Sequence, residues 1–207
     1  TATGQNAQAT AVNATAMGVN GKATGIEATA TGFETTASGA YATTSGSRAL
    51  ASGFGSTASG AQSEATADRA TAVGYDSVAL AQNSTATGAN AQATQENATA
   101  TGQNAQATAV NATAMGRSAI ANGTNSLSVG ASNKSLADKT VSIGSNNRVE
   151  AEGSSAIGQS NIINSSNTFV LGSNVNNTGR FDNFGNAIPI GNTVTNSVYL
   201  GSDTVAT

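Results

Sequence analysis

Cysteine and histidine are both absent from this chain of 207 residues. The absence of cysteine excludes disulfides and thiolate zinc sites, and the absence of histidine removes the commonest general base and metal ligand. An enzyme would then need paired carboxylates or a serine with a lysine, whereas the acidic residues of this chain are scattered. We therefore expect no enzymatic activity, no cofactor and no metal site.

Charge and long apolar runs are also scarce. Only 9% of the residues are charged, the formal net charge is −3, and the lysines and arginines are dispersed, so no basic stripe faces nucleic acid or anionic lipid. No apolar run reaches the length that crosses a bilayer, and no charged-then-apolar leader is present. We expect no nucleic-acid partner and no membrane contact by this segment, with any targeting or anchoring parts lying elsewhere in a longer protein.

Proline and aromatic residues are rare, with one proline and 4% aromatics. A composition this rich in Ser, Thr, Asn and Gly is typical of disorder, but a disordered chain has no reason to keep a fixed spacing. This chain keeps one through a ladder of thirteen glycines, each 14 residues after the last: Gly4, Gly18, Gly32, Gly46, Gly60, Gly74, Gly88, Gly102, Gly116, Gly130, Gly144, Gly158 and Gly172. The single period indicates one stack of similar coils.

Alanines and other small residues define the strands within each coil. With the ladder glycine counted as position 0, alanine fills positions 5 and 12 of most coils, as in Ala23 and Ala30, and small residues fill positions 3, 7 and 10. This alternation is typical of short strands with one face turned inward. A coiled coil also places alanine every seven residues, but the repeated Gly, Thr and Asn disfavour helix. We predict an all-β fold, a parallel β-roll with two strands and two Gly- or Asn-containing turns per coil.

The two outer faces of this roll differ in charge. Positions 4 and 6 carry polar and charged residues such as Lys22 and Glu64, which indicates a solvated sheet. Positions 11 and 13 carry no charge in thirteen coils and become more apolar toward the C-terminus. A charge-free outer sheet is what a subunit interface needs. We predict that the interface contains Met17, Val73, Met115, Leu127, Val129, Val141, Ile143, Ile157, Phe169 and Leu171.

Three consecutive coils carry a recurring motif. Residues 126–130 (SLSVG), 140–144 (TVSIG) and 154–158 (SSAIG) are each followed by small residues and a turn. They resemble the head repeats of trimeric autotransporter adhesins of the YadA-like type, and the resemblance covers essentially the whole chain. It departs before Gly116, where coils often place Thr or Ser at positions that the family gives to Val or Ile.

The resemblance implies a left-handed parallel β-roll in a homotrimer, with the charge-free sheets around the three-fold axis. It implies display on the surface of a Gram-negative bacterium and attachment to host matrix or cell-surface molecules, other bacteria or abiotic surfaces. Two other functions stay open. Thr-x-Thr units such as residues 29–31 resemble ice-binding solenoids, although Met17, Val73 and Met115 interrupt the array. A polysaccharide-active enzyme on a β-solenoid is the weaker alternative, because the acids do not converge.

The ladder ends at Gly172, and the next comparable glycine, Gly201, lies 29 residues later. We predict a head β-roll over residues 1–172, then a last coil with an insertion and a neck toward a stalk over residues 173–207. By resemblance, neck packing would involve Phe181, Phe184, Val198 and Leu200. The alternative is a surface loop whose phenylalanine rings pack on their own roll.

Aromatic residues at the turns are the candidate ligand contacts. Phe33 and Tyr75 both occupy position 1, three coils apart, and Tyr41 and Phe54 lie on the second turn of adjacent coils. Aromatic rings on a surface of small polar residues are plausible anchors for a partner. The alternative is that each ring covers its own turn or a neighbouring subunit.

Overall fold

A computed structural model describes residues 1–176 and 198–202 of the chain. Contacts divide the chain into two compact units, Thr1–Thr108 and Ala109–Thr207. Within the described residues the regular secondary structure consists of strands, joined by turns. The predicted all-β parallel solenoid with coils of 14 residues is confirmed in both units.

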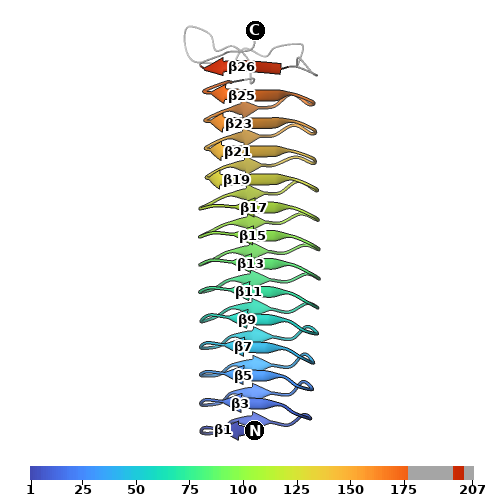
Figure 1. Cartoon of the computed structure of the whole chain (residues 1–207), viewed down its shortest axis with the longest axis vertical. Helices are drawn as coiled ribbons and strands as arrows, with labels where there is room; N and C mark the ends of the chain where they lie inside the picture. Colours follow the sequence, from blue (N-terminus) through green and yellow to red (C-terminus); the bar gives the residue numbers. More distant parts are fainter. Residues whose placement is uncertain (177–197, 203–207) are drawn as a thin grey trace. The chain divides into compact units, whose positions relative to one another are not determined.

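In the first unit each coil contributes one strand to each of two parallel sheets (Figure 1). The odd-numbered strands form the charge-free sheet: β1 Ala2–Thr3, β3 Thr15–Met17, β5 Thr29–Thr31, β7 Thr43–Ser45, β9 Thr57–Ser59, β11 Thr71–Val73, β13 Thr85–Thr87 and β15 Thr99–Thr101. The even-numbered strands form the solvated sheet: β2 Gln8–Ala9, β4 Lys22–Ala23, β6 Thr36–Ala37, β8 Leu50–Ala51, β10 Glu64–Ala65, β12 Val78–Ala79, β14 Gln92–Ala93 and β16 Gln106–Ala107.

The second unit has the same two sheets. Its charge-free sheet contains β17 Thr113–Met115, β19 Leu127–Ala131, β21 Val141–Ser145, β23 Ser155–Gln159, β25 Phe169–Ser173 and β26 Val198–Ser202. Its solvated sheet contains β18 Ile120–Ala121, β20 Lys134–Ser135, β22 Arg148–Val149 and β24 Ile162–Ile163. Strand β26 pairs directly with β25, with Gly172 opposite Gly201. The chain thus takes 29 residues, rather than 14, to pass from Gly172 to Gly201. The predicted boundary between head and neck stays a prediction.

The register places equivalent residues of successive coils side by side. Ala16 pairs with Ala30 in one sheet and Ala23 pairs with Ala37 in the other. The inward alanines at positions 5 and 12 are fully buried in nearly all coils of the first unit, as the alternation predicted. Each coil thus stacks its small side chains on those of the next, and the backbone hydrogen bonds run between coils.

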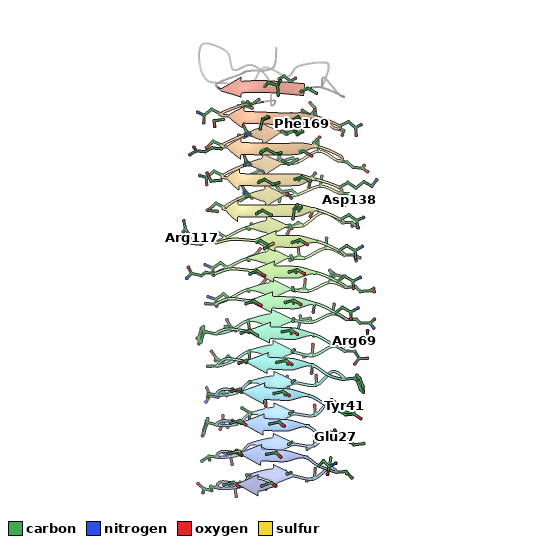
Figure 2. All side chains as sticks on the ribbon, in the orientation of Figure 1. Glu27, Tyr41, Arg69, Arg117, Asp138 and Phe169 are labelled. Carbon is green, nitrogen blue, oxygen red and sulfur yellow. The ribbon has the colours of Figure 1, made fainter. Side chains whose placement is uncertain are left out.

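In addition to the ladder glycine at position 0, each coil has a residue with positive φ at position 2 of its first turn and at position 9 of its second turn. Asparagine or glycine fills many of these places, as expected, because they tolerate positive φ. Several larger residues adopt the same conformation, among them Glu27, Tyr41 and Arg69. Figure 2 shows these three side chains directed away from one edge of the coils in the first unit.

The interior of the second unit contains larger side chains than the alanines and other small residues that the alternation places on the inward face. Val149, Ile163 and Val170 are fully buried there, as is a column of asparagines at position 3. In this column the Oδ1 atom of Asn147 accepts hydrogen bonds from the backbone N–H (3.1 Å) and Nδ2 (2.9 Å) of Asn161. The prediction of an interior made only of small side chains is wrong for this unit, because a buried amide is tolerated when neighbouring coils satisfy it.

Candidate interaction surfaces

The charge-free sheet presents apolar side chains to the outside of each unit. In its strands the middle residue points inward and is buried, as with Ala16, while its neighbours Thr15 and Met17 point outward. Met17, Val73, Met115 and Leu171 are exposed. The other predicted interface residues are half-buried: Leu127, Val129, Val141, Ile143, Ile157 and Phe169. All ten residues therefore lie on the outer face where the repeat pattern placed them.

The solvated sheet is less uniform than the sequence pattern suggested. Lys22 and Gln8 are exposed on it, as expected. Half-buried apolar residues also point outward from this sheet, including Leu50, Val78 and Ile120. The contrast between the two sheets is therefore one of charge rather than of hydrophobicity.

The four candidate aromatic residues are all exposed at turns. The rings of Tyr41 and Phe54 meet edge to face, with centroids 5.3 Å apart and an interplanar angle of 71°. Phe33 instead lies under the guanidinium of Arg48, 6.0 Å from the ring centroid, and Arg48 also pairs with Glu34 at 3.0 Å. The structure brings Tyr41 and Phe54 together in neighbouring coils, whereas Phe33 and Tyr75 stay three coils apart.

Two further exposed apolar residues at the second turn of the first unit were missed by the sequence reasoning. Val12 and Ile26 are 68% and 51% exposed in the coils that precede Tyr41 and Phe54. The available signal was an apolar residue at position 8 in three of the first four coils.

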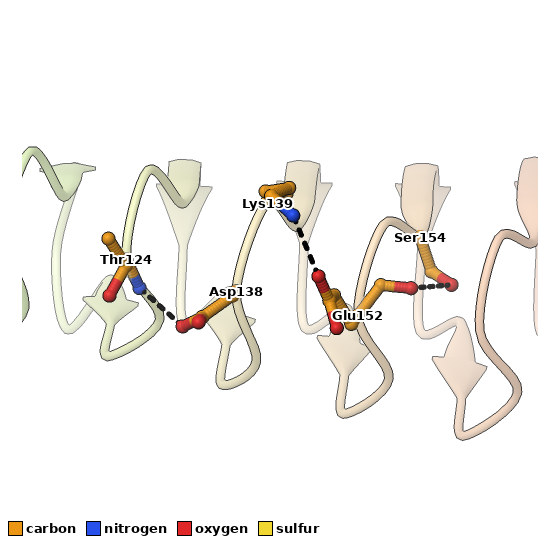
Figure 3. Close-up of polar contacts among 5 residues, drawn as sticks. All are labelled: Thr124, Asp138, Lys139, Glu152 and Ser154. Atoms are coloured by element: carbon orange, nitrogen blue, oxygen red, sulfur yellow. Dashed lines mark hydrogen bonds and ion pairs between the residues drawn. The ribbon is translucent and has the colours of Figure 1, made fainter.

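The same turn carries charged residues in the second unit (Figure 3). The Nζ atom of Lys139 donates to Oε1 of Glu152 at 2.8 Å, and Oδ1 of Asp138 accepts a hydrogen bond from the backbone N–H of Thr124 at 2.7 Å. The hydrogen bond with Glu152, and then its negative charge, raise the pKa of Lys139 above its ordinary value. Both side chains of this pair are exposed, so the pair contributes little to stability.

Val198 and Leu200, which were predicted to pack in the neck, lie on β26 and are exposed. Phe181 and Phe184 lie outside the described residues. Within residues 1–176 and 198–202, no group of three or more acidic side chains is placed to hold a metal ion. The same residues include no helix that is long and apolar enough to cross a bilayer.

Known proteins resemble this chain both in sequence and in structure. The sequence matches the YadA head domain repeat over residues 1–20, 23–49, 51–77, 79–105, 107–133 and 136–161, which together exceed half of the chain. The fold is similar to the crystal structure of the collagen-binding domain of the Yersinia adhesin YadA, with 28% sequence identity and a TM-score of 0.51. The similarity covers 63% of this chain and 79% of that chain. Comparison with curated protein sequences gives no match.

These matches confirm the resemblance that the repeated SLSVG-type motifs indicated. They support adhesion rather than ice binding, in line with the interruptions of the threonine array at Met17 and Val73. The chain belongs to the family of YadA head domain repeats.

Proposed function

We propose that three copies of this chain associate through their charge-free sheets to form the head of an adhesin. The observation that carries the proposal is an outer sheet with apolar side chains and no charge in any of its coils. The alanine interior of the first unit buries little apolar area per coil, so burial of Met17 and Val73 against neighbouring copies would add hydrophobic stabilisation. The opposite sheet carries Lys22 and Glu64 and would remain in water.

Light scattering on the purified chain tests this assembly. We expect a mass three times the 20.1 kDa of the single chain. Because the interface is apolar, the mass should persist in 1 M NaCl, which screens charge interactions beyond about 3 Å. A single-chain mass at micromolar concentration would contradict the proposal.

The proposed head is displayed on the surface of a Gram-negative bacterium. It attaches to host matrix or cell-surface proteins, other bacteria or abiotic surfaces. The solved relative is described as a collagen-binding domain, so collagen is the first ligand to test. A trimer would present three copies of a repetitive face, and weak contacts would then add through multivalency.

The turn aromatics are proposed as ligand contacts, and Tyr41 has the strongest case. Its φ of 61° lies in the left-handed region, which is unfavourable for a bulky side chain. The equivalent place holds asparagine in several other coils, as at Asn83 and Asn97. A strained tyrosine that projects beside Phe54 is therefore better explained by a surface role than by stability. Phe33 and Tyr75 are weaker candidates of the same kind.

Replacing Tyr41 by asparagine should weaken collagen binding about tenfold, which is the typical effect of losing one interface anchor. The free energy of unfolding should change by less than about 0.5 kcal/mol, because relief of strain offsets the lost ring contact. Biolayer interferometry on immobilised collagen and thermal unfolding measure the two effects.

Gln62→Asn is the matched control for this experiment. Gln62 is also left-handed, with a φ of 62°, but it lies on the first turn and carries no ring. This variant should keep full binding. Undiminished binding by Tyr41→Asn would reject the aromatic site.

A further inference from the structure

Two surface grooves lie at equivalent positions of the repeat, one in each unit. The groove of the first unit has a volume of about 590 Å³ and is lined by Asn6, Ala7, Gln8, Asn20, Lys22, Glu34 and Thr36. The groove of the second unit has a volume of about 300 Å³ and is lined by Ser132, Lys134, Asn146, Asn147, Arg148 and Ile162. Both run between side chains of the first turn, at position 2, and side chains of the solvated sheet, at position 4. Both volumes are within the range of small-ligand sites, about 300–1,000 Å³.

Each groove contains one lysine and one further charged residue that belongs to an ion pair, an acid in the first groove and a base in the second. In the first groove Glu34 is already paired with Arg48, which leaves the ammonium group of Lys22 without an acidic partner among the described residues. In the second groove Arg148 is paired with Glu150, which leaves Lys134 in the same situation. Each groove with its adjoining ion pair therefore has one excess positive charge, on a chain whose formal net charge is −3.

The remaining lining of the first groove is suited to hydroxyl groups rather than to apolar side chains, and in the second groove Ser132 and Asn146 offer polar groups at the same turn. Asn6, Gln8 and Asn20 each offer both a hydrogen-bond donor and an acceptor. One amide pair is already arranged across neighbouring coils, since Nδ2 of Asn6 lies 3.3 Å from Oδ1 of Asn20. The first groove contains no large apolar side chain that would hold a hydrophobic anchor.

From these features we infer that each groove binds an anionic sugar unit of an acidic polysaccharide. The lysine would bind the carboxylate or sulfate, and the amides would bind ring hydroxyl groups. The grooves lie beside the solvated sheet, so the proposed association through the charge-free sheets leaves them open. The inference thus adds a second class of ligand to the proposed attachment to matrix proteins.

Heteronuclear NMR with a hyaluronan tetrasaccharide as the probe tests this inference. We expect shift changes in the backbone amides of Gln8 and Asn20, which Lys22→Gln reduces while the changes at Asn146 remain as large as before. Lys134→Gln should give the reverse pattern. Each substitution should weaken its own site about fivefold, the scale of one exposed ionic contact, and 0.3 M NaCl should weaken both sites.

Two comparisons make the test decisive. The neutral sugar chitotetraose should bind more weakly than hyaluronan, and Lys139→Gln, which removes a lysine outside both grooves, should bind as the unsubstituted chain does. Equal binding of both sugars, or wild-type binding by the Lys22→Gln, Lys134→Gln double variant, would overturn the inference. Mass and collagen binding are measured on the same samples. If the unsubstituted chain is trimeric and binds collagen but does not bind hyaluronan, the grooves are rejected while the proposed trimer stands.

Discussion

Replacing Gly74 by alanine should destabilise the first unit by about 4 kcal/mol, because strain and overpacking each cost about 1–3 kcal/mol. Gly74 has a φ of +127°, which side chains rarely adopt. A Cβ atom at this position would also lie 2.6 Å from the carbonyl oxygen of Gly88 in the next coil. The backbones of the two coils cannot easily move apart to relieve this clash, because each is hydrogen-bonded to its neighbouring coils. Thermal and urea unfolding followed by circular dichroism measure the loss.

Gly21→Ala is the matched control, because this glycine lies outside the ladder. Its φ is not in the left-handed region, and the nearest atom to an added Cβ would be Oγ1 of Thr35, at an ordinary contact distance of 3.5 Å. Alanine already occupies the same position of the repeat at Ala49 and Ala91. This variant should be as stable as the original chain, or more stable by up to about 1 kcal/mol. Equal losses in the two variants would mean that the ladder glycines have no special structural role.

The repeat made most of the fold predictable from the sequence. Because coils stack in register, one reading of position 5 or 12 applies to every coil, and Ala23 and Ala30 are buried as expected. The contact between Tyr41 and Phe54 follows in the same way from their positions in adjacent coils. Their edge-to-face geometry could not be predicted, because it depends on side-chain torsions that the period does not specify.

The buried asparagine column of the second unit could not be predicted from the repeat. Asn133 and Asn147 occupy an inward position, but asparagine is common at turns, and the composition pointed to a lining of small side chains. Burial is possible because Nδ2 of Asn147 reaches the carbonyl oxygen of Gly158 at 2.8 Å while its Oδ1 binds the next asparagine. Gly158 lies 11 residues further along the chain, at the start of the next coil, so only the three-dimensional structure identifies it as the partner. The grooves were missed for a similar reason, since they depend on how far side chains at positions 2 and 4 project.

Replacing Ile143 by aspartate should abolish the proposed trimer at neutral pH. Ile143 points outward from β21 on the charge-free sheet and is half-buried in the single chain. Association around a three-fold axis would bring three such carboxylates together and remove them from water. An unpaired buried charge costs several kcal/mol, about 3–5 in measured cases, and mutual repulsion adds to that cost. Light scattering should therefore give the 20.1 kDa mass of one chain instead of three times that value.

Ile120→Asp separates this effect from a general loss of folding. Ile120 is also half-buried and points outward from a strand of the same unit, but β18 belongs to the solvated sheet. Its aspartate would remain in water, so this variant should keep the trimeric mass. Crowded, desolvated carboxyl groups have a raised pKa, so acidification to about pH 4 should restore association of Ile143→Asp as the groups become neutral. A trimer that persists in Ile143→Asp at neutral pH would show that the subunits associate through another face.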